Sequence, residues 1–276
     1  MLFTRPDGRR LRSLDPFMLM MPFIMKHRVE ASNYTTLELD YDRVKPYIQA
    51  RKATDTPVSL MTIVIAAYVR TVAAFPEVNR FVVNRKIYAR HGISFSFITL
   101  REGWDGEGEQ PETAVTVHFT GWETIDEIQQ KLEEAIATNR KPENENSIDR
   151  FLSGLFMLPV LPSFLVSCLK MLDRHNLLPK SIINISPFHA GMFFTNMASI
   201  RGPVILHHLY EFGTVTQFLA LGYSTTRAKS FALGITLDER LANGATNMRA
   251  TRYLQSLIYH PERLESPPDE VKEDVK

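Results

Sequence analysis

The stretch Phe231-Ala-Leu-Gly-Ile-Thr-Leu-Asp-Glu-Arg-Leu-Ala-Asn-Gly-Ala245 decides the fold of this chain. Its first half alternates large apolar residues with smaller ones, which is the period of two of a half-buried strand. The chain then turns through the charged triplet Asp238-Glu239-Arg240 and resumes at Asn243-Gly244. From residue 246 to residue 259, apolar side chains recur at helical spacing. We therefore predict a strand, a charged turn and a helix, which together place polar side chains at a sheet edge, where sites are often built.

The second half of this stretch, Asp238-Glu-Arg-Leu-Ala-Asn-Gly-Ala245, resembles a known signature. It is similar to the signature of the acyltransferase core of 2-oxo acid dehydrogenase complexes, a family that shares its fold with chloramphenicol acetyltransferase. That signature reads Asp-His-Arg-x-x-Asp/Asn-Gly-Ala and is followed by a helix. Every fixed position matches except one, because the catalytic His of the family is Glu239 here.

The resemblance extends over residues 21–264. Residues 21–40 resemble the first helix and strand of the family, and residues 57–79 resemble its next helix with the Pro-x-x-Asn that ends it. Phe194-Thr195-Asn196 resembles its Ser-Asn strand. The resemblance implies an α/β two-layer sandwich, a mixed β-sheet covered by helices. It also implies a homotrimer whose sites lie between subunits, with the catalytic His and the hydroxyl supplied by different chains.

Acyl transfer from coenzyme A to a thiol, amine or hydroxyl needs a base for the proton of the nucleophile. It also needs a donor that stabilises the oxyanion of the tetrahedral intermediate. By resemblance, Thr195 is that donor, Glu239 stands at the position of the base and Asn243 holds the turn. The neighbouring positions that the resemblance implies as structural are Asp238, Arg240, Gly244 and Asn196, with Asp238 as the partner of Arg240. The implied co-substrate is acyl-coenzyme A, the partner is a small-molecule acyl acceptor, and the residues that hold the coenzyme are not identified.

Glu239 leaves two interpretations open. A thiol has a pKa near 8.5 and a solvated glutamate one near 4.3, so a direct proton transfer between them is uphill by about four units. Burial in an enclosed pocket raises the pKa of a glutamate to about 6 or 7 and makes it a usable base. Glu239 is then either a working base or a salt-bridged residue in a site that has lost its chemistry. In the second case the protein is a coenzyme-binding or assembly protein without catalysis.

Three histidines, His189, His207 and His208, lie close in sequence to the site motifs. Neighbouring residues of a strand point to opposite faces, so only one of the pair 207–208 would face a pocket. We expect each of the three to be a satisfied structural histidine rather than a substitute base.

Composition excludes several classes of function. The chain has 276 residues and a formal net charge of +1, so no global field attracts nucleic acid. Its single cysteine, Cys168, permits no intrachain disulfide, and with the absence of a secretory signal this indicates the cytoplasm. No Cys/His cluster has zinc spacing, so we expect no metal. No lipoyl-attachment segment precedes the core, so we expect an isolated core.

The organisation that we expect is one domain over residues 1–265. Residues 1–15 read as a solvated arm or as an arm that packs on a neighbouring subunit, and residues 17–25 as a buried helix start. Residues 266–276 are charged, with two prolines, and read as a disordered tail. The acidic, Gly-rich residues 101–111 read as a mobile loop. Further predicted strands are 34–41, 81–83, 86–89, 93–100, 113–119, 191–196, 204–208 and 214–221, and further predicted helices are 43–52, 59–75 and 124–140.

The apolar segment 151–172 carries one charge, Lys170, and is broken by Pro159 and Pro162. We expect two short helices, 148–158 and 163–172. They either form a buried hairpin on the sheet or at a subunit contact, or expose an apolar patch to a membrane, a partner or a lipid-like acyl chain. We favour the buried hairpin over contact with a membrane.

Overall fold

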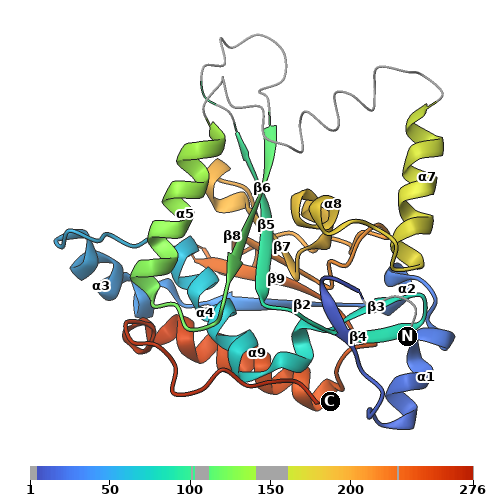
Figure 1. The fold of residues 1–276 in the computed structure, drawn as a ribbon. Coiled ribbons are helices and arrows are strands. Elements are labelled where there is room, and N and C mark those ends of the chain that lie inside the picture. The colour runs from blue at the N-terminus through green and yellow to red at the C-terminus, as the bar shows by residue number, and fades with distance from the viewer. Residues whose placement is uncertain (1–4, 101, 103–111, 141–160, 229, 276) are drawn as a thin grey trace.

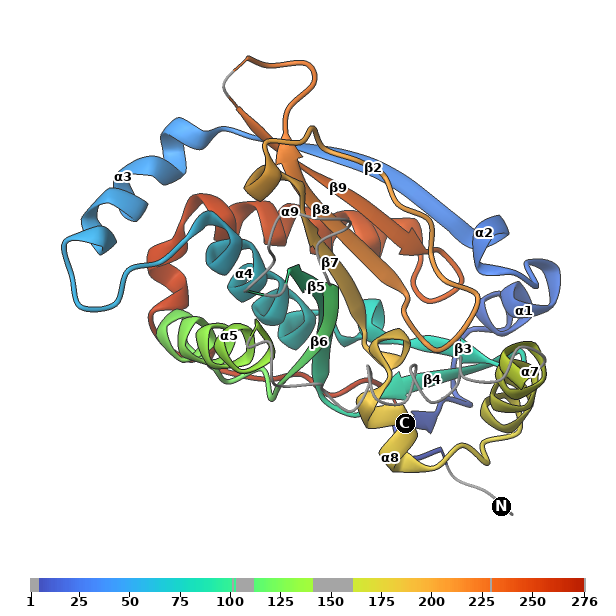
Figure 2. The same ribbon diagram turned by 90° about the horizontal axis from the view of Figure 1, so that it is seen from above.

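A mixed sheet covered by helices forms the body of the molecule. The computed structural model describes residues 5–100, 102, 112–140, 161–228 and 230–275, and among these the largest sheet has six strands in the order β2-β9-β8-β7-β5-β6. They are β2 (Ser32–Leu39), β5 (Ile93–Leu100), β6 (Glu112–Phe119), β7 (Met192–Asn196), β8 (Gln217–Tyr223) and β9 (Phe231–Asp238). β7 lies parallel to β5 and β8, and the other pairs are antiparallel. Helices α4 (Leu60–Ala74), α5 (Ile125–Arg140) and α9 (Gly244–Tyr259) cover one face (Figures 1 and 2), which confirms the predicted fold class.

A smaller sheet, β1-β4-β3, and several short helices complete the described structure. Its strands are β1 (Gly8–Arg10), β3 (Phe81–Val83) and β4 (Lys86–Arg90). The remaining α-helices are α1 (Pro16–Ile24), α2 (Arg28–Ala31), α3 (Tyr41–Lys52), α7 (Leu161–Arg174) and α8 (Lys180–Ile185). Short 3₁₀ helices span Pro76–Asn79, Pro187–His189, Met197–Ile200 and Pro261–Leu264.

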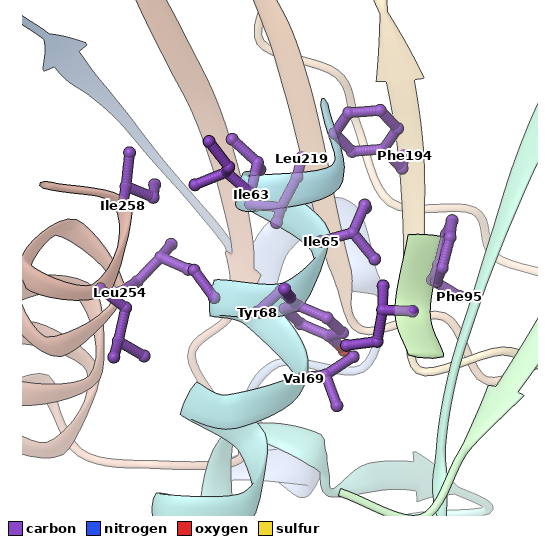
Figure 3. Packing of buried hydrophobic residues seen from close by; sticks show 14 of the residues in the cluster. Ile63, Ile65, Tyr68, Val69, Phe95, Phe194, Leu219, Leu254 and Ile258 are labelled. Carbon is purple, nitrogen blue, oxygen red and sulfur yellow. The ribbon is translucent and has the colours of Figure 1, made fainter. Parts of the chain in front are cut away.

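Helix α4 forms the centre of the hydrophobic core. Residues 62 to 73 are all buried, as the nearly uniform apolar sequence predicts. Figure 3 shows Ile63, Ile65 and Tyr68 of α4 between side chains of the sheet and of α9. Each fully buried side chain of this size contributes about 1.5–3 kcal/mol by leaving water. The core therefore fixes α4 between the sheet and α9.

The beginnings of α4 and α5 follow local sequence signals. The Ser59 hydroxyl accepts a hydrogen bond from the Thr62 backbone N–H at 3.1 Å. Before α5, the Glu127 carboxylate accepts from the Thr124 backbone N–H at 2.7 Å, and the Thr124 hydroxyl accepts from the Glu127 N–H at 3.3 Å. These are the reciprocal bonds of a capping box, which the sequence predicts for α5.

The N-terminal segment packs on its own chain, so the prediction of a solvated arm was wrong for the described residues. β1 pairs with β4 in the register Gly8 to Arg90. Arg5 is buried, and its guanidinium donates to Asp173 at 2.7 Å. The β3–β4 hairpin, which the sequence predicts, has one open edge. β1 pairs with that edge, so the N-terminal segment is not solvated.

Residues 204–208 do not form the predicted strand. They cross the face of β8 and β9, where added Cβ atoms at Gly222 and Gly234 would overlap the backbone of this segment. The Thr236 hydroxyl donates to the His207 carbonyl at 2.7 Å. Both edges of β8 are occupied by β7 and β9, so the segment packs on a face of the sheet instead of joining it.

Residues 266–275 are held against the domain, so the prediction of a disordered tail was wrong for them. The Lys272 backbone N–H donates to the Ala73 carbonyl at 2.9 Å. Arg80 donates to both carboxylate oxygens of Asp274, at 2.7 and 2.6 Å. The charge of the tail, which indicated disorder, serves instead to pair it with a buried arginine.

Two apolar helices are more exposed than predicted. In α1, Phe17, Phe23 and Ile24 are 61%, 55% and 58% exposed, so the expectation of a buried helix start was wrong for a single chain. In α7, Phe164 and Met171 are exposed whereas Leu169 packs against Leu178 and Ile183, so the second predicted helix forms but is only partly buried in a single chain. The first predicted helix, 148–158, and the acidic loop, apart from residue 102, lie outside the described residues. No described helix is long and apolar enough to cross a membrane.

Candidate functional site

The signature turn joins the end of β9 to the start of α9. Asp238 pairs with Ser32 as the last residue of β9, and the Glu239 backbone N–H donates to the Ala31 carbonyl at 2.9 Å. The Asn243 side chain accepts from the Thr246 backbone N–H at 2.8 Å and caps α9. The resemblance implied that Asn243 holds this turn, and the cap is the interaction by which it does so.

Asp238 and Arg240 form a buried, two-pronged ion pair. Arg240 Nε lies 2.8 Å from one carboxylate oxygen of Asp238, and Nη2 lies 2.6 Å from the other. The side chain of Arg240 is 3% exposed and that of Asp238 is 0% exposed. Arg240 also donates to the Met25 carbonyl at 3.1 Å, which ties the turn to the end of α1. The pair is the one that the sequence implied, and its role is to hold the turn.

Glu239 takes no part in that ion pair. Its side chain is exposed, and its carboxylate forms no hydrogen bond or ion pair with any described residue. If Glu239 is a working base, it must lie in an enclosed pocket. If it is instead a salt-bridged residue, a cation must lie beside it. A single chain provides neither for Glu239, because Arg240 is already paired with Asp238.

Thr195 and Asn196 lie at the end of β7. Among the described residues, the Thr195 hydroxyl forms one hydrogen bond, to the sulfur of Met197 at 3.9 Å, and donates to no carbonyl. Asn196 contacts the sulfur of Met61 at 3.7 Å, and its buried Oδ1 has no hydrogen-bond partner among the described residues.

One chain does not bring Thr195 and Glu239 together. Thr195 pairs with Ala220 of β8, which pairs with Gly234 of β9. Glu239 follows five residues after Gly234, and at about 3.3 Å per residue the two functional positions are roughly 16 Å apart along the sheet. This separation is what a site shared between two chains requires.

Gly244 does not have a steric reason to be glycine within one chain. A Cβ atom at this position would meet no atom within 4 Å. The residue begins α9 without a left-handed backbone. Its match to the signature therefore has no explanation in the packing of the single chain.

His189 is structural, as predicted. Its side chain is fully buried, its Nδ1 lies 2.8 Å from the Ser186 hydroxyl, and its Nε2 lies 3.4 Å from Asp173.

His207 and His208 lie on the same side of the chain, which the strand prediction excluded. Their rings stack at 4.5 Å, and the ring of His207 lies on that of Phe218 at 4.0 Å. His207 Nδ1 lies 2.7 Å from the His208 carbonyl, so it donates there and leaves Nε2 as an acceptor. Burial lowers the pKa of His207, despite the backbone hydrogen bond, and favours the neutral ring. Among the described residues, neither His207 Nε2 nor either ring nitrogen of the exposed His208 has a hydrogen-bond partner.

Arg28 lies at the same end of the sheet as the signature turn. The sequence analysis did not identify this residue. It is 5% exposed, and its guanidinium donates to the carbonyls of Tyr210 and Gly213, each at 2.6 Å. Its backbone N–H donates to Glu211 at 2.7 Å. No local pattern marks Arg28, because its partners lie about 180 residues away.

A metal centre is not evident in the part of the chain that the structure describes. No three side chains among its His, Cys, Asp and Glu residues lie together as metal ligands would.

Comparison with known proteins identifies the fold. No protein-family model and no curated protein sequence matches this chain. Among solved structures, it is similar to a probable dihydrolipoamide acetyltransferase from Listeria monocytogenes, with 12% identity, a TM-score of 0.52 and coverage of 96% of this chain and 99% of that one. It is also similar to a truncated catalytic core of the 2-oxoacid dehydrogenase multienzyme complex from Thermoplasma acidophilum, with 13% identity, a TM-score of 0.52 and coverage of 92% and 99%. A chloramphenicol acetyltransferase matches with 10% identity, a TM-score of 0.53 and coverage of 91% and 99%. The chain therefore has the acyltransferase fold that chloramphenicol acetyltransferase and the catalytic cores of 2-oxo acid dehydrogenase complexes share.

Proposed function

We propose that this protein transfers an acyl group from acyl-coenzyme A to a small acceptor, at sites shared between the chains of a homotrimer. The proposal rests on the observation that neither of the two reacting side chains is held by a carbonyl or by a charged partner among the described residues. The Thr195 hydroxyl has no carbonyl partner and the Glu239 carboxylate has no cation partner among the described residues. They lie at opposite ends of the sheet, so a site that uses both takes them from two chains.

In the proposed reaction, Glu239 accepts the proton of the acceptor thiol, amine or hydroxyl as the acceptor attacks the thioester carbonyl. The Thr195 hydroxyl donates a hydrogen bond to the oxyanion that forms. Collapse of the tetrahedral intermediate breaks the carbon–sulfur bond. The departing thiolate takes the proton back from Glu239, which returns the site to its starting state.

A second candidate function follows from the exposure of Glu239. If the neighbouring chain does not enclose this carboxylate, the protein binds coenzyme A or acyl-coenzyme A without catalysis and serves as a binding or assembly protein. Calorimetry with coenzyme A, in parallel with the turnover assay below, distinguishes binding alone from catalysis.

The test measures release of free coenzyme A thiol from acetyl-coenzyme A in the presence of a small thiol or amine acceptor. Glu239→Gln keeps the shape and removes the base, so it should reduce the rate about 10²–10⁴-fold. Thr195→Val should cause a loss of similar size, because one oxyanion donor contributes about 10²–10³-fold. Glu239→His restores the histidine of the related signature and should retain or raise activity.

His207→Asn tests the competing base in the same assay. If His207 rather than Glu239 takes the proton, this variant loses the rate and Glu239→Gln keeps it. Turnover by the wild type that is unchanged in Glu239→Gln would contradict the assignment of the base. A wild type that binds coenzyme A without turnover, while Glu239→His is active, would establish the second candidate function.

A further inference from the structure

A cavity of about 360 Å³ lies beside the signature turn, between α1, α2, the turn of the β3–β4 hairpin and α7. In Figures 1 and 2 these elements lie at the same side of the molecule, at the opposite end from α3. Basic side chains dominate its lining: Lys26, Arg28, Arg85, Lys170, Arg174 and Arg240. Neither Thr195 nor Glu239, the two residues of the proposed acyl transfer, lines this cavity.

The two acidic groups in the lining have other hydrogen-bond partners. Asp173 pairs with Arg5 at 2.7 Å and lies 3.4 Å from His189. Glu211 accepts the backbone N–H groups of Arg28 and Val29 at 2.7 and 3.2 Å. Within the described part of the chain, neither carboxylate lies within ion-pair distance of Lys26, Arg85, Lys170 or Arg174.

Four of the basic side chains have no carboxylate partner within ion-pair distance in the described part of the chain. They are Lys26, Arg85, Lys170 and Arg174. Arg174 donates to the neutral side chain of Asn84 at 3.2 Å, and the guanidinium of Arg85 lies over the Phe23 ring. Several like charges around one cavity repel one another unless an anion lies between them.

The fifth basic group, Arg28, is buried and incompletely bonded. Its Nη atoms donate to backbone carbonyls, which carry no full charge, and its buried Nε has no hydrogen-bond partner among the described residues. Burial lowers the pKa of Arg28, although the nearby charge of Asp238 opposes that shift. Because no carboxylate of the described residues lies within ion-pair distance of the Arg28 guanidinium, a bound anion would add countercharge there.

We propose that this cavity binds a small molecule that carries two or more phosphate or carboxylate groups. Lys170 and Arg174 of α7 and Arg85 of the hairpin turn bind its oxyanions through charge-assisted hydrogen bonds. Pro22, Val82 and Phe212 provide an apolar wall for the uncharged part of the molecule. The volume lies within the range of about 300–1,000 Å³ that small-molecule sites occupy.

Isothermal titration calorimetry of the full chain tests this site, with inorganic pyrophosphate as the phosphate probe and citrate as the carboxylate probe. At low salt, at least one probe should bind, and its affinity should fall as salt is raised. The double variant Lys170→Ala/Arg174→Ala should weaken binding about tenfold or more. Both side chains are exposed on α7, so this variant should keep the circular dichroism of the wild type.

The matched control is Lys45→Ala/Lys52→Ala, which removes the same charge from exposed positions of α3 at the far end of the molecule. It should bind the probe as the wild type does. Equal weakening by both double variants, or no binding of either probe at millimolar concentration, would overturn the proposal. These outcomes do not depend on acyl transfer, because no turnover is measured.

Discussion

Adjacent residues of the signature turn have opposite environments. Arg240 is buried against Asp238, whereas Glu239 between them is exposed and unpaired. Removal of one member of a buried pair leaves an uncompensated charge, so Arg240→Leu should lower the free energy of unfolding by about 3–5 kcal/mol. Urea denaturation at a fixed protein concentration measures this loss. Glu239→Gln is the matched control and should change stability by less than about 0.5 kcal/mol; a similar loss in both variants would contradict the structural assignment.

Asp173 connects three segments of the chain, and its pKa predicts a pH effect. Burial disfavours its charged form, but the hydrogen bond from His189 and the charge of Arg5 outweigh burial and hold the pKa of Asp173 below its ordinary value. A lowered pKa in the folded state stabilises the fold above the pKa of the unfolded state, and this stabilisation disappears as the pH falls. The advantage of the wild type over Asp173→Asn in urea denaturation should be full near pH 7 and shrink below about pH 4. An advantage that stays constant over this range would show that the carboxylate charge is not what stabilises the contact.

At the scale of elements, Arg80 links the C-terminal segment to the signature turn. Arg80 binds Asp274 with two nitrogens and donates from the third to the Leu241 carbonyl at 3.0 Å. Because this pair is buried, Asp274→Ala should lower the free energy of unfolding by about 3 kcal/mol. Glu273→Ala is the control, since Glu273 is exposed and forms no hydrogen bond or ion pair with the described residues. Urea denaturation of the two variants decides the point, and equal midpoints would mean that the segment does not stabilise the domain.

At the scale of the whole molecule, the separation of Thr195 from Glu239 predicts complementation between chains. In a trimer, each site would take Thr195 from one chain and Glu239 from its neighbour. When inactive Thr195→Val and Glu239→Gln chains are co-expressed and assemble at random, about one quarter of the sites have both native residues. Activity should therefore recover to about one quarter of the wild-type value, with light scattering as the check that the mixed protein is a trimer. A monomer in solution, or no recovery in mixed trimers, would contradict the shared site.

The sequence by itself determined the elements whose signals are local. The core helix α4, the capping box of α5 and the strand-turn-helix at residues 231–259 all lie where periodicity and capping residues predicted. The Asp238–Arg240 pair was also predictable, because its members are two residues apart. Local signals suffice here because hydrogen bonds and the apolar period within a single element decide its type.

The tertiary structure alone decided what each element contacts. Residues 204–208 were predicted to form a strand, but only the sheet shows that both edges of β8 are already occupied. The charge of the tail suggested disorder, because its partner Arg80 is 194 residues away. The resemblance assigns Thr195 and Glu239 to one site, but the strand register places them at opposite ends of the sheet within one chain. Periodicity specifies which face of an element is apolar and carries no information on which distant segment covers it, so these contacts follow only from the packed fold.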